Sequence, residues 1–485
     1  MAEKNNIKIG FEKQIWDAAC VLWGHIPAAE YRKVIVGLIF LRYISEAFEK
    51  RYQQLVKEGD GFEDDRDAYT AENIFFVPEN ARWSVISSAA HTPEIGTVID
   101  NAMRAIESEN KILKNVLPKN YATPDLDKRV LGDVVDLFTN MDMSGTEDSK
   151  DLLGRTYEYC IAQFAAYEGV KGGEFYTPSS IVKTIVSVLK PFSNCRVYDP
   201  CCGSGGMFVQ SAKFIQAHSN NRGAISVYGQ ESNADTWKMA KMNMAIRGID
   251  ADFGSYHADT FFNDLHPTLK ADFIMANPPF NLSNWGQDKL QEDVRWKYGI
   301  PPAGNANYAW IQHMICSMAS GKGRMAVVMP QGILFRNQET EIRKQLIESD
   351  LIEAVVTLGD KLFYGTGLSP CFLIIRRMKP AHHSGRILMI DGSKILTQKR
   401  AQNVLEENDI DRLYLLYQNY SNKEDYSRIV TLQEIRDKEY ILSPNRYVVY
   451  HKEEIRPYAE VLAEFKQAYE DVKRLEKEFS LLINA

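Results

Sequence analysis

The sequence lacks any apolar run long enough to cross a membrane. Its best apolar stretch, residues 34–41, lies between basic residues, and it is much shorter than the roughly 18 residues that a membrane helix needs. The amino terminus carries no apolar core of a signal peptide. We therefore expect a cytoplasmic protein without a membrane partner, in which residues 34–41 form part of a buried helix.

Cysteine and histidine are scarce, and they are not spaced as metal ligands. The chain has 7 cysteines and 9 histidines. Cys201 and Cys202 are adjacent rather than separated by two residues, and no nearby histidine completes a zinc site. A reducing compartment would also keep thiols free. We expect these cysteines to be structural, and we expect no metal site.

A clear excess of basic residues is also missing. The chain has 57 Lys and Arg against 64 Asp and Glu, which gives a formal net charge of −7. Proteins that hold duplex DNA unaided usually show a basic excess, because phosphate neutralisation supplies most non-specific affinity. If this protein acts on DNA, the balance favours a subunit that gains much of its grip from a partner, although a local basic cleft stays compatible with the total.

The sequence does contain a glycine-rich turn between a predicted strand and a predicted helix. Residues 195–198 predict the strand, Met207 begins the helix, and Gly203-Ser204-Gly205-Gly206 lies between them, after Asp199. Such a turn lets a ligand approach the helix N-terminus closely. The spacing is not that of the dinucleotide fingerprint, and a glycine loop alone is weak evidence.

Acidic residues follow successive predicted strands. Glu231 ends the segment 224–231, where a carboxylate suits the ribose hydroxyls of an adenosine. A third candidate strand leads to Asp259, which could accept a hydrogen bond from an adenine amine. Each acid alone is more often a solvated loop residue. Because open α/β sheets bind ligands at the carboxyl ends of their strands, the series with Asp199 predicts a nucleoside pocket.

The fourth predicted strand, residues 271–276, leads to Asn277-Pro278-Pro279-Phe280. The side-chain carbonyl of Asn277 and the backbone carbonyl of Pro278 can accept both hydrogens of an exocyclic amine, which aims its lone pair at an electrophilic methyl group. The prolines fix φ and remove backbone donors, so the loop is stiff. Phe280 offers a face for stacking a flipped base. An ordinary Asn-Pro turn is the alternative, and the clamp alone does not separate adenine from cytosine.

In this order, the motifs resemble those of the methylase (modification) subunit of type I restriction–modification systems, a DNA adenine-N6 methyltransferase that uses S-adenosylmethionine. Residues 15–44 are similar to the amino-terminal helical domain of that family, and residues 172–178 resemble its entry motif over the cofactor. Further matches are residues 324–332, 363–367 and 442–447. The pair Cys201-Cys202 stands where the family more often has small non-thiol residues, and we expect no loss of function from this difference.

The resemblance implies that Asn277, Pro278, Pro279 and Phe280 hold the target adenine. With the acids and glycines above, the predicted S-adenosylmethionine site comprises Glu174, Phe175, Tyr176, Thr177, Pro178, Ser179, Asp199, Gly203, Ser204, Gly205, Gly206, Glu231 and Asp259. The resemblance also implies double-stranded DNA as the substrate and protection of host DNA from restriction. The implied partners are a specificity subunit that chooses the target sequence, bound by two methylase copies, and a restriction (translocase/endonuclease) subunit.

The predicted fold is α/β, a Rossmann-like methyltransferase with a largely parallel sheet. An α-helical N-terminal domain (1–150) precedes the methyltransferase domain (151–400), and a C-terminal helical extension (401–485) follows it. Later strands are predicted at 325–329, 352–357, 371–375 and 387–390, separated by helical stretches. The connection 281–307 is long and aperiodic, so it is interpreted either as a flap that orders near DNA or as a mobile insertion.

Near the carboxyl end, apolar residues recur at spacings of three and four. They are Ile455, Tyr458, Leu462, Phe465, Tyr469, Val472, Phe479 and Leu482. This stripe predicts a helix that contacts another helix. Packing on its own domain is one possibility, whereas the resemblance favours docking onto helices of the specificity subunit.

Other functions stay open at this point. An N4-cytosine DNA methyltransferase, a ribosomal-RNA methyltransferase and a protein-glutamine methyltransferase all act on planar amines, although the last two are usually shorter and lack a long helical front domain. A non-catalytic assembly scaffold is the alternative outside enzymes. Intact Asn277, Phe280 and Glu231 argue against the scaffold.

Overall fold

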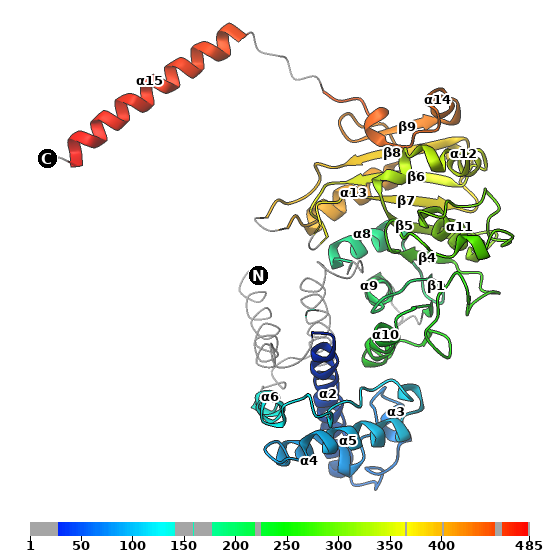
Figure 1. Cartoon of the computed structure of the whole chain (residues 1–485), viewed down its shortest axis with the longest axis vertical. Helices are drawn as coiled ribbons and strands as arrows, with labels where there is room; N and C mark the ends of the chain where they lie inside the picture. Colours follow the sequence, from blue (N-terminus) through cyan, green and yellow to red (C-terminus); the bar gives the residue numbers. More distant parts are fainter. Residues whose placement is uncertain are drawn as a thin grey trace.

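One mixed β-sheet forms the centre of the protein, and a group of helices formed by the first third of the chain lies at one end of it (Figure 1). The computed structural model describes residues 28–140, 159, 177–218, 225–363, 366–399, 402–451 and 458–483. Among these residues, no helix combines the length and the apolar character needed to span a bilayer.

The amino-terminal helices pack around a long central helix, α2. They are α2 (Ala28–Glu58), α3 (Asp67–Thr70), η2 (Glu79–Ala81), α4 (Trp83–Ser88), α5 (Ile95–Glu109), η3 (Lys111–Leu113) and α6 (Lys128–Asn140). The apolar run 34–41 lies within α2, and its hydrophobic side chains are at most 3% exposed. The prediction of a buried helix there is confirmed.

Helix α10 (Ala234–Ile246) connects these helices to the sheet. Met239, Met242 and Ile246 belong to the same buried cluster as α2 and α5. An ion pair of 3.0 Å between Lys33 and Asp235 lies at the edge of this contact. Because both of its side chains are partly exposed, the pair contributes less than the apolar burial does.

The sheet has nine strands in the order β3-β2-β1-β4-β5-β7-β6-β8-β9. The strands are β1 (Arg196–Asp199), β2 (Ser226–Gly229), β3 (Ala251–Asp252), β4 (Phe273–Ala276), β5 (Arg324–Pro330), β6 (Ile352–Leu358), β7 (Pro370–Arg376), β8 (Arg386–Gly392) and β9 (Ser427–Thr431). Only β7 and β9 run antiparallel to their neighbours. The largely parallel α/β sheet expected from the sequence is confirmed.

Both faces of the sheet are covered. The connecting helices are α8 (Ser179–Leu189), α9 (Gly206–His218), α11 (Asn307–Ser317), α12 (Thr340–Glu348), α13 (Glu407–Asn419) and α14 (Leu432–Asp437), with short turns η4 (Gln287–Lys289), η5 (Gln331–Leu334), η6 (Asn337–Glu339), η7 (Ala381–His383) and η8 (Pro444–Arg446). The sheet continues past residue 400, because β9 pairs with β8, and α13 packs against α8.

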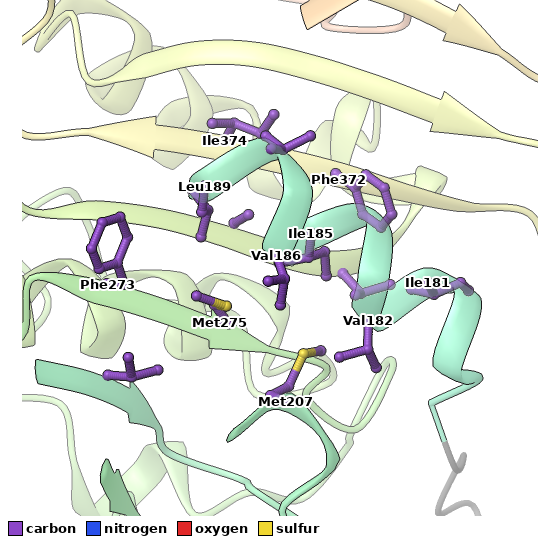
Figure 2. Packing of buried hydrophobic residues seen from close by; sticks show 14 of the residues in the cluster. Ile181, Val182, Ile185, Val186, Leu189, Met207, Phe273, Met275, Phe372 and Ile374 are labelled. Atoms are coloured by element: carbon purple, nitrogen blue, oxygen red, sulfur yellow. The ribbon is translucent and has the colours of Figure 1, made fainter. Parts of the chain in front are cut away.

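Alternate residues of each central strand enter two separate buried clusters, one on each face. On β4, Phe273 and Met275 belong to one cluster, and Ile274 and Ala276 belong to the other. This is why the central strands are mostly apolar on both sides, as strands buried on both faces are, with the buried Glu353 of β6 as an exception. Figure 2 shows the first of these clusters, in which α8 lies across β4 and β7.

Helix α15 (Tyr458–Ile483) extends away from the rest of the protein (Figure 1). The predicted amphipathic helix is present over these residues, whereas Ile455 lies outside the described residues. Its apolar stripe is uncovered, since Phe465 is 66% exposed and Phe479 is 64% exposed. No part of the chain that the structure describes buries this stripe.

Ile185 tests the packing of α8 on the sheet. Its side chain is fully buried in the cluster of Figure 2, so Ile185→Ala should lower the free energy of unfolding by about 2–5 kcal/mol. The same change at Ile300, which is 51% exposed, should cost less than about 0.5 kcal/mol. Denaturant unfolding followed by tryptophan fluorescence measures both, and equal effects would contradict this packing.

Candidate functional site

The candidate site lies where the strand order reverses around β1. The neighbours of β1 are β2 on one side and β4 on the other, and all three strands are parallel. Their carboxyl ends therefore meet, which brings Asp199, Glu231 and Asn277 to one edge of the sheet. In open α/β sheets this reversal leaves a crevice for ligands.

The glycine turn after β1 has a backbone that requires glycine. Gly203 has φ 53° and Gly205 has φ 82°, a region that other residues rarely adopt. A Cβ on Gly205 would also lie 2.9 Å from the side chain of Met244 on α10. The same helix holds the turn with a hydrogen bond of 2.6 Å from Asn243 Nδ2 to the Ser204 carbonyl. Helix α10 thus fixes the turn on one side. Gly206, the last residue of the turn, begins α9.

Two carboxylates lie close together at this turn. Asp199 is 2% exposed and accepts hydrogen bonds from the backbone and the thiol of Cys201. Burial raises the pKa of Asp199 to about 7, the bonds from Cys201 act against this shift, and the charge of Glu231 adds to it. Glu231 Oε2 accepts from the Gly203 amide at 3.1 Å, and its Oε1 accepts from the Asn233 amide at 2.8 Å. Such a pair favours a cationic group nearby.

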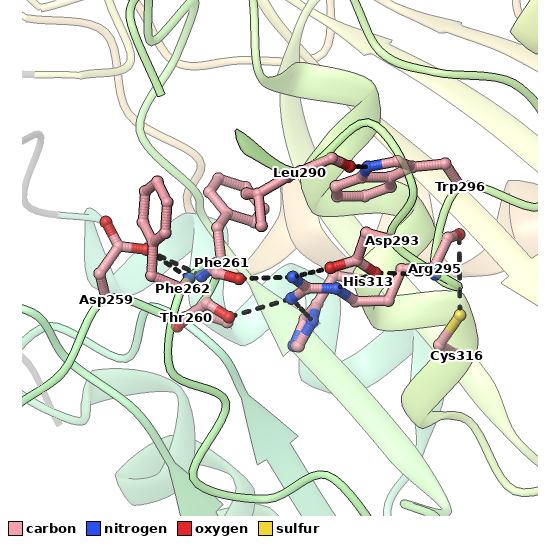
Figure 3. A network of polar contacts seen from close by, with 10 residues as sticks. All are labelled: Asp259, Thr260, Phe261, Phe262, Leu290, Asp293, Arg295, Trp296, His313 and Cys316. Carbon is pink, nitrogen blue, oxygen red and sulfur yellow. Dashed lines mark hydrogen bonds and ion pairs between the residues drawn. The ribbon is translucent and has the colours of Figure 1, made fainter. Parts of the chain in front are cut away.

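Asp259 lies in a loop rather than at a strand end. The expected third strand is present as β3, but it is only two residues long and ends at Asp252, so it does not reach Asp259. Asp259 is exposed, and its Oδ1 accepts from the amides of Phe261 at 2.8 Å and Phe262 at 3.4 Å (Figure 3). These bonds form a tight turn that orients the carboxylate.

Arg295 lies in the loop 281–307, after the clamp, and binds the turn at Asp259 (Figure 3). Its guanidinium donates to the carbonyls of Thr260 and Phe261 and to both oxygens of Asp293. Arginine can satisfy several acceptors at once because its planar group carries five donors. Arg295 has no signal in the sequence, because it lies in an aperiodic segment and the residues of the turn that it binds are distant in sequence.

A buried histidine extends the network to β1. Burial and the charge of Arg295 lower the pKa of His313 to about 3, so its ring is neutral. Its Nδ1 lies 3.1 Å from Arg295 Nη1, and its Nε2 lies 3.0 Å from the hydroxyl of Tyr198. Because Arg295 can only donate, Nδ1 accepts and Nε2 carries the proton. The loop is therefore joined to the centre of the sheet.

The connection 281–307 is packed, which differs from both a substrate-ordered flap and a mobile insertion. Trp285, Trp296 and Tyr298 are 4%, 7% and 8% exposed. The indole nitrogens of the two tryptophans donate to the carbonyls of Pro302 at 3.0 Å and Leu290 at 2.6 Å. Aromatic residues with satisfied polar atoms give this loop a core of its own, and its aromatic content was the available sequence signal.

The clamp follows β4, and the entry motif meets it. Asn277 Nδ2 donates to Thr177 Oγ1 at 2.8 Å, two residues before α8 begins. Phe280 packs edge-on against Phe363, with ring centroids 5.9 Å apart. Thr177 was predicted to contact the cofactor, and the structure also brings it to the clamp. Pro278 is buried and Pro279 is half-buried.

The remaining predicted residues divide into two groups. Pro178 is buried before α8, and Ser179 begins the helix on the surface. Glu174, Phe175 and Tyr176 lie outside the described residues.

Burial raises the pKa of the Cys201 and Cys202 thiols well above the usual range, so both stay protonated. Within the described ranges, no three His, Cys, Asp or Glu side chains gather as metal ligands.

Two families match this chain. The N-6 DNA Methylase family matches residues 148–455, and the HsdM N-terminal domain matches residues 11–138. The methylase subunit of the type I restriction enzyme HindI from Haemophilus influenzae is 39% identical over 403 residues, covering 77% of this chain and 89% of the relative. The MjaIX methylase subunit from Methanocaldococcus jannaschii is 34% identical over 473 residues, covering 90% and 84%.

Solved structures with a similar fold include proteins of the same kind. The crystal structure of the type I restriction-modification system methyltransferase subunit from Streptococcus thermophilus superimposes with a TM-score of 0.78 at 24% identity, covering 91% of this chain and 99% of that one. A modification subunit of a putative type I restriction enzyme from Vibrio vulnificus gives a TM-score of 0.66, covering 87% and 93%. The chain therefore belongs to the N-6 DNA methylase family, among the methylase subunits of type I restriction enzymes.

Proposed function

We propose that this protein transfers a methyl group from S-adenosylmethionine to N6 of adenine in double-stranded DNA, with Asn277 to Phe280 as the clamp for the adenine. The observation that carries the proposal is the geometry of Asn277 at the carboxyl end of β4. Its amide nitrogen donates to Thr177 Oγ1, and its strand end lies on the same edge of the sheet as the carboxylates of Asp199 and Glu231. Membership of the N-6 family favours adenine over the cytosine, RNA and protein alternatives.

The bond to Thr177 supports this role because it orients the amide of Asn277. With Nδ2 donating to Thr177 Oγ1, the carbonyl oxygen points to the other side of the amide, where it can accept a hydrogen from the target amine. The backbone carbonyl of Pro278 can accept the second hydrogen. Phe363 holds Phe280 edge-on, so Phe280 is fixed for stacking on a flipped base. In this proposal, these residues promote the reaction mainly by positioning the target amine relative to the methyl donor.

The residues at the end of β1 and β2 fit S-adenosylmethionine, which supplies an electrophilic methyl group on a sulfonium. The buried carboxyl of Asp199 suits the α-ammonium of the methionine part, because a cation would favour its ionised form. Glu231 suits the ribose hydroxyls, and the oriented carboxylate of Asp259 suits the adenine amine. The turn from Gly203 to Gly206 lets the ligand approach the backbone closely. Glu174 to Ser179 complete the proposed site.

The protein acts, in this proposal, in the cytoplasm as part of a larger enzyme. Its relatives are named as methylase subunits of type I restriction enzymes. A specificity subunit would choose the target sequence and bind two methylase copies, and a restriction subunit would join them. The exposed stripe of α15 and the net charge of −7 support docking on a partner that contributes basic surface. The divisions at residues 150 and 400 remain predictions.

Replacing Asn277 tests the clamp. Asn277→Ala should lower kcat for DNA methylation by at least about 10²-fold, as the loss of a single well-placed polar contact to the reacting group does. Affinity for S-adenosylmethionine should be unchanged, because Asn277 contacts the target amine and not the donor. The rate is measured by tritium transfer in complex with the specificity subunit. A wild-type rate would refute the clamp, and Asn419→Ala on the exposed end of α13 is the control.

Asp199 predicts a pH dependence of cofactor affinity. The pKa of its carboxyl is raised to about 7 by burial, and only the ionised form attracts an ammonium. Affinity should therefore be full above this pKa and should fall below it, by up to about tenfold per pH unit. Calorimetric titrations at pH values from roughly one unit below this pKa to more than one unit above it measure the affinity for S-adenosylmethionine. Asp199→Asn should bind weakly with a flat profile, and an unchanged profile in that variant would exclude Asp199.

Helix α15 predicts a separable docking function. A chain that ends at His451 should still fold and bind S-adenosylmethionine, because α15 is exposed over nearly its whole described length. It should not elute with the specificity subunit in size-exclusion chromatography. Phe465→Glu on the stripe should also prevent assembly, whereas Ala463→Glu, beside the stripe on the same helix, should not. Normal assembly of the shortened chain would overturn this role.

A further inference from the structure

The residue that follows the clamp has an unusual backbone. Asn281 has φ 55°, a left-handed conformation that is sparsely populated outside glycine, although asparagine adopts it more readily than most residues. Both its side chain and its backbone amide form hydrogen bonds that fix this residue.

Three donors from two segments converge on the side-chain oxygen of Asn281. Asn307 Nδ2 lies 3.1 Å from Oδ1, Asn305 Nδ2 lies 3.3 Å away, and Arg336 Nη1 lies 2.7 Å away. The backbone amide of Asn281 donates in return to Asn307 Oδ1 at 3.0 Å. Asn305 and Asn307 are 7% and 0% exposed, so this set of bonds is largely shielded from water.

The two asparagines come from the far end of the loop 281–307. Asn307 is the first residue of α11, and the amide of Ala306 donates to the carbonyl of Leu282 at 2.9 Å. The loop is thereby closed at its base, next to the clamp. Because α11 belongs to the buried cluster on one face of the sheet, the base of the loop has a rigid support.

Arg336 reaches Asn281 from the segment after β5. A Cβ on Gly332 would lie 2.8 Å from Arg336 Nε, so this glycine leaves room for the guanidinium. The backbone carbonyl of Arg336 accepts from the buried Arg343 at 3.0 Å. Glu339 is 1% exposed, burial raises its pKa, and Arg336 and Arg343 act against that shift. A charged donor makes the bond to Asn281 a strong one.

We propose that Asn281 and Arg336 are positioning residues that fix the carboxyl end of the clamp before DNA binds, an inference that rests on the proposed role of Asn277. The clamp is then held at both ends. Thr177 orients Asn277, the first residue of the clamp. The bonds to Asn281 fix the backbone directly after Phe280, the last residue of the clamp. The Pro278 carbonyl and the Phe280 ring lie between these two anchors, so neither has to be ordered by the substrate.

The reason to expect an effect on rate is geometric. Methyl transfer needs the target nitrogen at bonding distance from the donor and in line with it, and an error of about 1 Å can cost on the order of 10²-fold in rate. Releasing Asn281 lets the Pro278 carbonyl and the Phe280 ring move relative to β4. The cofactor site at the end of β1 and β2 lies on other segments and is unaffected.

Asn281→Gly in the complete complex with the specificity subunit separates the side chain from the backbone. Glycine adopts φ 55° without strain, so this variant loses only the shared acceptor. We expect kcat at saturating substrates to fall by about 10- to 100-fold, with unchanged affinity for S-adenosylmethionine and for DNA. Asn281→Asp keeps an acceptor and tolerates the same φ, so it should restore most of the rate.

Asn284→Gly is the matched control. Asn284 lies in the same loop with φ 54°, it is exposed, and its side chain makes no hydrogen bond among the described residues. Its rate should stay at the wild-type value. If Asn281→Gly also keeps the wild-type rate, or if it loses cofactor affinity as strongly as kcat, the proposal is wrong.

Arg336→Met tests the same contact from the other side and serves if Asn281→Gly does not fold. It should also lower kcat, and the double variant should be little worse than Asn281→Gly alone, because Asn281→Gly already removes the bond to Arg336. Additive losses, or an unchanged rate in Arg336→Met, would overturn the proposal. A wild-type rate in Asn277→Ala would refute the clamp itself, whereas an inactive Asn277→Ala beside a fully active Asn281→Gly refutes only the inference about Asn281 and Arg336.

Discussion

Burial of the sheet on both faces is the constraint on which the rest of the structure depends. The central strands are mostly apolar, with Phe273 and Met275 of β4 facing one cluster and Ile274 and Ala276 facing the other. Side chains along such strands pack into the core, and a polar one such as Glu353 of β6 is buried with its hydrogen-bond partners. Polar function is therefore confined to the strand ends, and the parallel arrangement of β1, β2 and β4 puts these ends on one edge.

That edge is built from loops, and hydrogen bonds between these loops fix many of its polar groups in place. Two arginines that follow β4 and β5 provide much of this order. Arg295 binds the carbonyls of Thr260 and Phe261, and Arg336 binds the side chain of Asn281. Each ties together segments that are distant in sequence, and each satisfies acceptors that would otherwise be costly to bury. Positioning chemistry of the kind proposed for Asn277 depends on such rigidity.

Helix α15 shows the opposite arrangement. Its apolar stripe is exposed, with no covering element in the described part of the chain, whereas the helices on the sheet bury theirs. Exposed stripes of this size mark surfaces that meet another molecule. The edge that carries the proposed site and the exposed helix are thus separate features. Long-range contacts complete the first, whereas no element in the described part of the chain covers the second.

The sequence by itself determined the elements and the order of the motifs. The strands at β4 to β8, the helix over 34–41, the amphipathic carboxyl-terminal helix and the turn at Asn277 after β4 all follow from local patterns, because apolar periodicity and proline or glycine placement act over a few residues. The sequence also placed the acids Asp199 and Glu231 beside the glycine turn. Only the tertiary structure decided which distant residues meet. The contact of Thr177 with Asn277, the hold of Arg295 on the turn at Asp259, and the convergence of Asn305, Asn307 and Arg336 on Asn281 have no periodic signal, since hydrogen bonds between segments depend on how the sheet brings its loops together.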